Sequence, residues 1–294
     1  MQLVRERNPR LARRLPVGTG AALRLVTRER TLNREIADAV SLDAARADAT
    51  SVNTSSNIAS SRFAPSGPER VREFCDRTLA RLDVSVKIEG GEHLRDADRP
   101  IVCANHPTGG VDGLALISAI IAIRGRCRVP ANDLLNLVTP LQPVILPVNR
   151  GRPSRERVAS LLHAFQGADP ILVFPAGVTA RIHAGVLKER AWESTFVTRA
   201  RQTGRALVPV HVSGRNSRRF YLIHRVRTAL GIDFNLEMAL LVDELFRRGG
   251  ETVVLRFLPP RYAGSTDRNG DRVQATAIRR EVERAGKRRT ETQL

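Results

Sequence analysis

The stretch VCANHPTGGVDGLAL, residues 102–116, places a histidine and an aspartate on either side of a glycine pair. An apolar run that ends at Asn105 and His106 predicts a buried strand, and the apolar segment after Asp112 predicts a helix. The turn between them can bring the Asp112 carboxylate to one nitrogen of His106. That contact would fix the imidazole tautomer and raise the basicity of its other nitrogen. A base held in this way can take a proton from a hydroxyl group.

The same residues also fit a purely structural role. Asp112 can cap the helix that begins beside it, and His106 can hydrogen-bond the main chain of a turn. Isolated His/Asp pairs are common in proteins, so the spacing alone leaves both interpretations open.

Strands and helices alternate from about residue 67 onward, which predicts an α/β domain with a mainly parallel central sheet flanked by helices. In such sheets the carboxyl ends of the strands collect ligand-binding groups, and His106 lies at one of these ends. The expected strands are 84–90, 99–105, 143–150, 170–177, 206–214 and 252–260. The expected helices are 66–82, 113–121, 154–168, 189–203 and 234–248, with one more at 273–287 in the C-terminal tail.

Three regions divide the chain: a basic N-terminal helical extension with a Ser-rich linker (1–66), the α/β domain (67–262) and a polar C-terminal tail (263–294). The extension has arginines interleaved with leucines, so it can lie on an anionic membrane surface or pack back on the domain. No apolar run reaches the roughly 20 residues of a membrane span, and no signal core is present. We therefore expect a cytoplasmic protein, peripheral on the inner face of the cell membrane.

The composition narrows the choice of partner. The 294 residues carry a net charge of +18, which favours anionic partners. Only 4% of the residues are aromatic, which leaves little for stacking on bases and argues against nucleic acid. The spacings of Cys75, Cys103 and Cys127 predict neither a disulfide framework nor a metal site.

Four stretches, in chain order, resemble the blocks of the glycerolipid acyltransferase superfamily, the lysophosphatidic acid acyltransferase type. NHPTGGVDG (105–113) resembles the first block, Asn-His-x4-Asp, and PVNRG (147–151) resembles the second. FPAGVTAR (174–181) resembles the third, Phe-Pro-Glu-Gly-Thr-Arg, and LVPVHVSG (207–214) resembles the fourth.

The departures from that pattern are themselves informative. Five residues instead of four separate the histidine from the aspartate. Ala176 stands in place of Glu, and Thr179 stands in place of Arg, with Arg181 two positions later. Together with Trp192, Phe196 and GRNSRRFY (214–221), they resemble the hemolysin-like branch, which includes acyltransferases that complete ornithine and glycine lipids.

The resemblance implies transfer of a fatty acyl group from acyl-CoA or acyl-ACP (acyl carrier protein) to the hydroxyl of a lyso-aminolipid or lysophospholipid. It implies His106 as general base and Asp112 as its orienting partner. Main-chain N–H groups of the Gly-rich turns would stabilise the oxyanion, and neither a metal nor a permanently bound cofactor is needed. The substrate-binding residues that it implies are Asn105, Gly109, Gly110, Arg150, Phe174, Pro175, Gly177, Arg181, Arg215 and Asn216.

Three alternatives remain open. The altered third block also fits a catalytically degenerate protein that binds a lipid or an acyl thioester without turnover. The positive charge also fits a nucleic-acid-binding protein, although that leaves the His/Asp block unexplained. An esterase that pairs His106 with a serine nucleophile ranks lowest, because the sequence has no Gly-x-Ser-x-Gly motif.

Overall fold

The structure is a computed structural model that describes residues 67–131, 135, 138–148, 155–183, 186–229, 244, 249–264 and 267–287. The expected N-terminal extension and linker, 1–66, lie outside the described residues. So does the expected helix 234–248, apart from Glu244.

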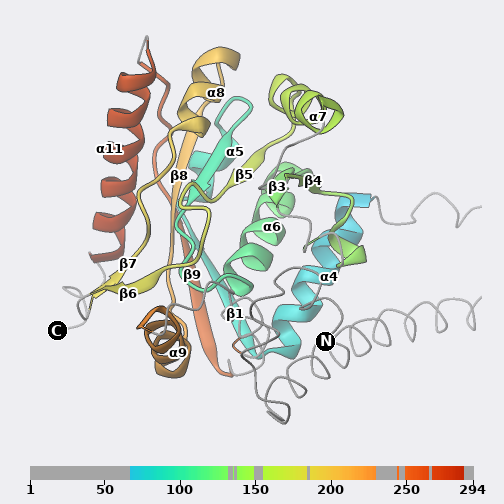
Figure 1. The fold of residues 1–294 in the computed structure, drawn as a ribbon. Helices are drawn as coiled ribbons and strands as arrows, with labels where there is room; N and C mark the ends of the chain where they lie inside the picture. Colours follow the sequence, from blue (N-terminus) through green and yellow to red (C-terminus); the bar gives the residue numbers. More distant parts are fainter. Residues whose placement is uncertain are drawn as a thin grey trace, which may run out of the picture. The chain divides into compact units, whose positions relative to one another are not determined.

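A five-stranded sheet forms the centre of the described domain (Figure 1). Its strands lie in the order β1 (Val84–Glu89), β9 (Glu251–Phe257), β8 (Leu207–Val212), β2 (Ile101–Ala104) and β5 (Ile171–Val173). Neighbouring strands are parallel except at the junction of β8 with β9, which is antiparallel. The mainly parallel sheet that the alternating pattern predicts is therefore confirmed.

Two short strand pairs lie outside this sheet. β3 (Val129–Ala131) pairs in parallel with β4 (Ile145–Pro147), and β6 (Arg181–His183) pairs antiparallel with β7 (Val186–Lys188). The expected strand 143–150 is thus only three residues long, and it is linked to the central sheet through β3, beside which Arg128 bridges Ile171 of β5. Its prolines lack the N–H that a central strand must donate.

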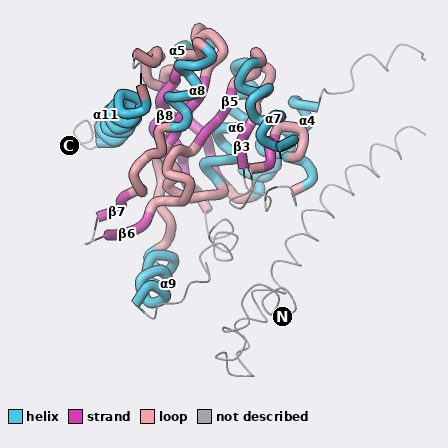
Figure 2. The backbone as a smooth tube through the Cα atoms, turned by 45° about the horizontal axis from the view of Figure 1, so that its top comes forward, coloured by secondary structure: helices cyan, strands magenta, loops and turns pink. Residues whose placement is uncertain are grey.

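Helices cover both faces of the sheet (Figures 1 and 2). The helices on one face are α4 (Gly67–Arg81) and α6 (Val111–Arg124), and those on the other are α8 (Thr195–Thr203) and α11 (Arg268–Lys287). Alternate side chains of β2 join the two resulting cores, with Val102 and Ala104 in one and Ile101 and Cys103 in the other. The remaining described helices are α5 (Gly91–Arg95), η3 (Thr139–Leu141), α7 (Arg155–Gln166) and α9 (Arg218–Ala229). None of the helices in the described part of the chain is long and apolar enough to cross a membrane.

The region after residue 262, which the sequence separates as a polar tail, contributes α11 to the core of the domain. Ala275, Ile278 and Val282 of this helix are buried in the same cluster as residues of β2 and α8. At its first turn the fully buried Asp271 carboxylate accepts hydrogen bonds from Thr198 at 2.7 Å and from Arg201. The apolar positions recur at helical spacing, but they are few among many charged residues.

Arg205 is a fully buried cation that joins the segments leading into the central strands. Its guanidinium donates hydrogen bonds to main-chain carbonyl oxygens of three neighbouring segments. These acceptors belong to Arg99 (2.9 Å), Ala164 (3.2 Å), Phe165 (2.7 Å), Gly167 (2.6 Å) and Asp169 (3.0 Å). Burial lowers the pKa of Arg205 to about 10, so the group keeps its charge at neutral pH. Several of these carbonyls end α7, where a positive charge also complements the helix dipole.

We expect Arg205→Met to lower the free energy of unfolding by about 3 kcal/mol or more, because it leaves several buried carbonyls without a donor. Arg72→Met, at an exposed position of α4, should change it by less than about 0.5 kcal/mol. Urea unfolding followed by circular dichroism measures both. Equal stability of the two variants would show that the buried guanidinium is not required.

Candidate active site

The carboxyl ends of β2, β5 and β8 lie at the same end of the sheet because the three strands run parallel. His106 follows β2, and Phe174 follows β5 directly. The Asn105 carboxamide donates to the Val212 carbonyl at 2.9 Å and accepts from the Val212 N–H at 2.7 Å. Asn105, expected at the substrate, thus uses both ends of its amide to join β2 to β8.

His106 and Asp112 are in direct contact. His106 Nδ1 lies 3.1 Å from Asp112 Oδ2, the carboxylate is fully buried, and 17% of the histidine side chain stays exposed. The N–H groups of Thr108 (2.9 Å) and Gly109 (3.2 Å) donate to the same oxygen, and that of Gly113 (3.0 Å) donates to Oδ1. Gly109 has a φ of +96°, a conformation that glycine adopts readily. Asp112 therefore contacts the imidazole and closes the turn before α6. It is not the N-cap that the spacing also allowed, because Gly110 occupies that position.

These contacts correct one expectation about the Gly-rich turns. The N–H groups of Thr108, Gly109 and Gly113 are bound by the Asp112 carboxylate. The Gly177 N–H donates to the Phe174 carbonyl at 2.9 Å. These four N–H groups therefore close the turns and do not point at a substrate oxyanion.

Burial and charge act in opposite directions on the His106–Asp112 pair. Burial disfavours the charged imidazolium, but the Asp112 carboxylate and, more weakly, Glu189 outweigh it and raise the pKa of His106. Burial likewise disfavours the Asp112 carboxylate. The neighbouring imidazole and the N–H donors outweigh that effect and lower the pKa of Asp112. His106 is thus a stronger base than an ordinary histidine, beside an ionised carboxylate.

Two further side chains hold His106 in place. Phe174 stacks on the imidazole, with ring centroids 4.0 Å apart and an interplanar angle of 28°. Glu189, directly after β7, accepts a hydrogen bond from the main-chain N–H of His106 through Oε1 and one from Trp192 Nε1 at 2.9 Å through Oε2. The sequence analysis did not identify Glu189. A single glutamate 83 positions from His106 carries no local signal.

Arg181 lies close enough to the pair for its charge to oppose the rise in the His106 pKa. Its guanidinium donates to the Thr179 hydroxyl, to the Thr179 carbonyl at 3.0 Å and to the Ala180 carbonyl at 3.2 Å. It also lies 4.8 Å from the centre of the Phe220 ring. Arg150 lies outside the described residues.

The other expected substrate-binding residues lie in the turns after β2 and β5 or in the segment after β8. Gly110 is the N-cap of α6, the buried Pro175 accepts a hydrogen bond from the Glu193 N–H at 3.0 Å, and Gly177 is exposed with a φ of +65°. After β8, Arg215 is exposed, whereas Asn216 is only 3% exposed.

The arginine-rich stretch 214–227 has its aromatic side chains in the interior. It forms most of α9, in which Phe220 and Tyr221 are buried. The Tyr221 hydroxyl accepts a hydrogen bond from the Asn216 N–H at 3.0 Å. These two rings are packing residues. The exposed side chains among the described ones of this stretch include Arg218, Arg219, Arg225 and the 59% exposed Leu222.

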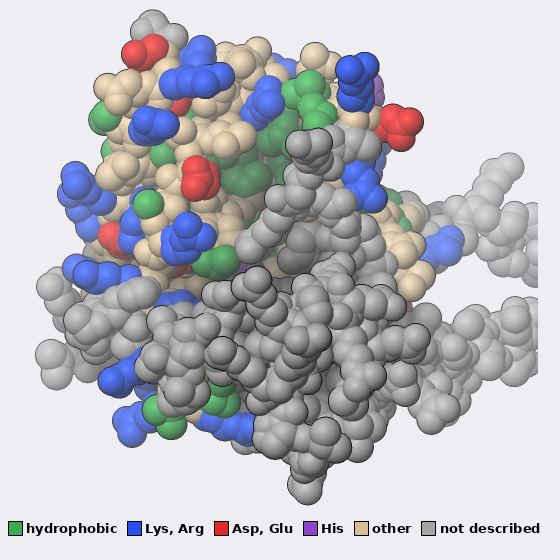
Figure 3. Space-filling view, viewed as in Figure 1, with side chains coloured by type: hydrophobic (Ala, Val, Ile, Leu, Met, Phe, Trp, Pro, Cys, Tyr) green, Lys and Arg blue, Asp and Glu red, His purple; other side chains and the backbone are tan. Residues whose placement is uncertain are grey.

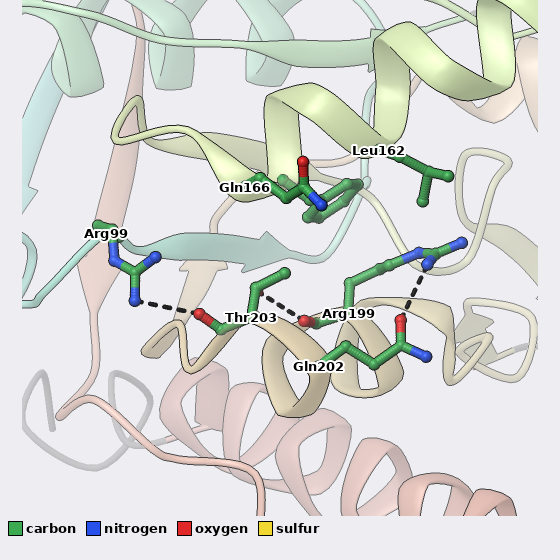
Figure 4. A pocket seen from close by; sticks show the side chains of 7 residues that line it. Arg99, Leu162, Gln166, Arg199, Gln202 and Thr203 are labelled. Atoms are coloured by element: carbon green, nitrogen blue, oxygen red, sulfur yellow. Dashed lines mark hydrogen bonds between the residues drawn. The ribbon is translucent and has the colours of Figure 1, made fainter.

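A cavity of about 240 Å³ lies at the opposite, amino-terminal edge of the same strands (Figure 4). It opens between α7, α8 and the segment before β2, and none of the expected site residues lines it. Its lining residues are Arg99, Leu162, Phe165, Gln166, Arg199, Gln202 and Thr203. In the described part of the chain, no group of three His, Cys, Asp or Glu side chains is placed to hold a metal ion.

Comparison with known proteins points to one family. A family model described as "Acyltransferase" matches residues 62–290. The chain is 35% identical over 190 residues to a lyso-glycine lipid O-acyltransferase of Bacteroides thetaiotaomicron, covering 64% of this chain and 70% of that protein. It is 36% identical over 191 residues to a lyso-glycine lipid O-acyltransferase of Phocaeicola vulgatus, covering 64% and 68%. The crystal structure of the 1-acyl-sn-glycerophosphate (LPA) acyltransferase PlsC from Thermotoga maritima matches 74% of this chain and 79% of its own, with 16% identity and a TM-score of 0.49.

We expect Asp112→Asn to lower the pKa of His106 by roughly one unit or more, because the neutral amide no longer stabilises the imidazolium. An NMR titration of the imidazole protons measures this shift. Asp98→Asn, which removes a carboxylate with a 69% exposed side chain, is the control and should leave the His106 pKa unchanged. An unshifted titration in Asp112→Asn would mean that the carboxylate does not act on the imidazole.

Proposed function

The chain belongs to the acyltransferase family, and from that premise we propose that it transfers a fatty acyl group from an acyl thioester to the hydroxyl of a lyso-lipid. One observation carries the proposal: a partly exposed histidine is bound by a fully buried aspartate at the carboxyl ends of the central strands. The family match and the two curated relatives support the reaction class.

In the proposed reaction, His106 is the general base. With Nδ1–H donated to Asp112, the neutral imidazole presents Nε2 as an acceptor for the proton of the lyso-lipid hydroxyl. The hydroxyl oxygen attacks the thioester carbonyl as the proton moves to Nε2, and the C–S bond breaks when the tetrahedral intermediate collapses. The imidazolium then protonates the departing thiolate, which leaves an ester and a thiol. Asp112 stays ionised throughout and stabilises the imidazolium.

The acceptor that we favour is a lyso-aminolipid. The two curated relatives are both lyso-glycine lipid O-acyltransferases. The third block has lost the Glu and Arg of the glycerol-phosphate type at Ala176 and Thr179. Arg181, beside the His106–Asp112 pair, is the group that we assign to an anionic part of the acceptor or donor, because a guanidinium suits carboxylate and phosphate oxygens. The donor is acyl-CoA or acyl-ACP, and no bound cofactor takes part.

We place the reaction at an anionic membrane surface. The exposed side of α9 carries Arg218, Arg219 and Arg225 around the exposed Leu222. This helix packs against β6, which begins with Arg181. Lys and Arg side chains also outnumber Asp and Glu on the face seen in Figure 3. Cationic side chains around an apolar one favour the headgroup region of anionic lipids.

The decisive assay follows label from a radioactive acyl-CoA and acyl-ACP to a panel of lyso-aminolipids and lysophospholipids. We expect transfer to a lyso-aminolipid, a loss of at least about 100-fold in His106→Ala and a smaller loss in Asp112→Asn. Both variants should keep the circular dichroism spectrum of the wild type. A folded His106→Ala variant with full activity would rule out the proposed base. A wild type that binds a lyso-lipid but transfers nothing would favour the degenerate binding protein.

Arg181→Gln should raise the KM of the substrate that carries the recognised anion by roughly ten-fold, with a smaller change in kcat, because binding is lost before chemistry begins. Steady-state kinetics with each substrate varied in turn measures this. Arg190→Gln, at an exposed position near the same hairpin, is the matched control and should behave as the wild type. A fall in kcat at unchanged KM for both substrates would contradict a binding role.

A further inference from the structure

The main chain of His106 is held from both sides. Its carbonyl accepts a hydrogen bond from the Ala180 N–H at 2.9 Å, and its N–H donates to Glu189 Oε1. The second oxygen of Glu189 accepts from the indole of Trp192 at 2.9 Å. Trp192 is itself buried in the core cluster of α8 and α11. The chain around His106 is thus tied through Glu189 to the interior of the domain.

The Glu189 carboxylate uses both oxygens as acceptors, which suits the ionised form. Burial raises the pKa of Glu189 above its ordinary value, because it outweighs the His106 N–H, Trp192, the imidazole and Arg279, each of which favours the charged form. The main-chain carbonyl of Glu189 also accepts a hydrogen bond from Arg279 of α11 at 3.1 Å. The segment is therefore anchored to α11 as well as to Trp192.

The charged groups facing His106 come from three places in the fold. Asp112 of α6 and Glu189 after β7 favour the imidazolium, and Arg181 of β6 opposes it. The third block contributes no carboxylate, because position 176 is an alanine only 5% exposed in the cluster that contains Trp192. The second negative charge at the site is that of Glu189. Its segment lies beside the third block, where the Glu193 N–H donates to the Pro175 carbonyl at 3.0 Å.

We propose that Glu189 is a positioning residue for acyl transfer, whose carboxylate fixes the His106 main chain and whose negative charge stabilises the imidazolium that forms during the reaction. The proposal rests on the proposed role of His106 as base. Glu189 acts through His106, since its two oxygens are taken by the His106 N–H and the Trp192 indole.

The sign of the effect on pH dependence follows from the charge. A carboxylate favours the protonated imidazole, and a base must be unprotonated to accept the hydroxyl proton. Glu189→Gln keeps an acceptor oxygen for the His106 N–H but removes the charge. The acid limb of kcat/KM should therefore move to lower pH, by roughly half a unit. The turnover number should fall by about ten-fold, and the KM of both substrates should stay the same.

The test compares pH profiles of kcat/KM for the wild type, Glu189→Gln and Glu193→Gln. Glu193 is exposed, and its contact with Pro175 uses only the main chain, so Glu193→Gln is a matched control and should keep the wild-type profile. An NMR titration of His106 gives a second measurement that does not depend on turnover. It should show the same shift to lower pH in Glu189→Gln.

The two proposals fail in different ways. The role of Glu189 is overturned if folded Glu189→Gln keeps both the acid limb and the His106 titration of the wild type. An inactive His106→Ala would still support His106 as the base. A fully active His106→Ala overturns the base itself. If Glu189→Gln does not fold, the milder Trp192→Phe variant, which removes the N–H bound to Glu189, is titrated in its place. An unshifted His106 titration in Trp192→Phe then also counts against a role of Glu189 beyond packing.

Discussion

The arrangement of this site depends on the hydrogen bonds that the fully buried carboxylate of Asp112 requires. A negative charge without water has to be met by N–H donors. Here the donors are the main-chain N–H groups of Thr108, Gly109 and Gly113 and the imidazole of His106. These hydrogen bonds close the Gly-rich turn, stabilise the start of α6 and orient the imidazole at the same time. The packing requirement and the chemical requirement are therefore met by the same hydrogen bonds.

The two ends of the central strands contain buried groups of opposite charge. At the carboxyl ends of the strands the buried Asp112 carboxylate accepts hydrogen bonds from N–H groups. At their amino ends the buried Arg205 guanidinium donates hydrogen bonds to carbonyl oxygens. Arg205 joins segments that are distant in the sequence, whereas the donors around Asp112 all lie within six residues of it. Asn105 adds a third tie, from β2 to β8. A rigid frame of this kind keeps the His106 side chain in position and leaves it partly exposed.

The altered third block does not leave the site short of negative charge. Its alanine packs in the core, and the carboxylate that reaches His106 comes from Glu189, after the β6–β7 hairpin. Its arginine, displaced to position 181, stays beside the pair. The departures that made the sequence resemble a separate branch thus correspond to a rearranged set of charges around a retained His/Asp pair.

The sequence by itself predicted what depends on neighbouring residues: the apolar runs of the central strands, the α/β class, and the His106–Asp112 pair with the turn that joins its members. It predicted a helix at 273–287, which α11 confirms, but not that this helix packs in the core, because its buried residues are sparse among charges. Only the tertiary structure decided the partners that come from far along the chain, such as Glu189 at His106 and the carbonyls around Arg205. It also decided that the Phe220 ring is buried. The physical reason is that a hydrogen bond between distant segments is specified by how the sheet and helices pack, and a lone Glu or Arg has no periodicity that reveals its partner.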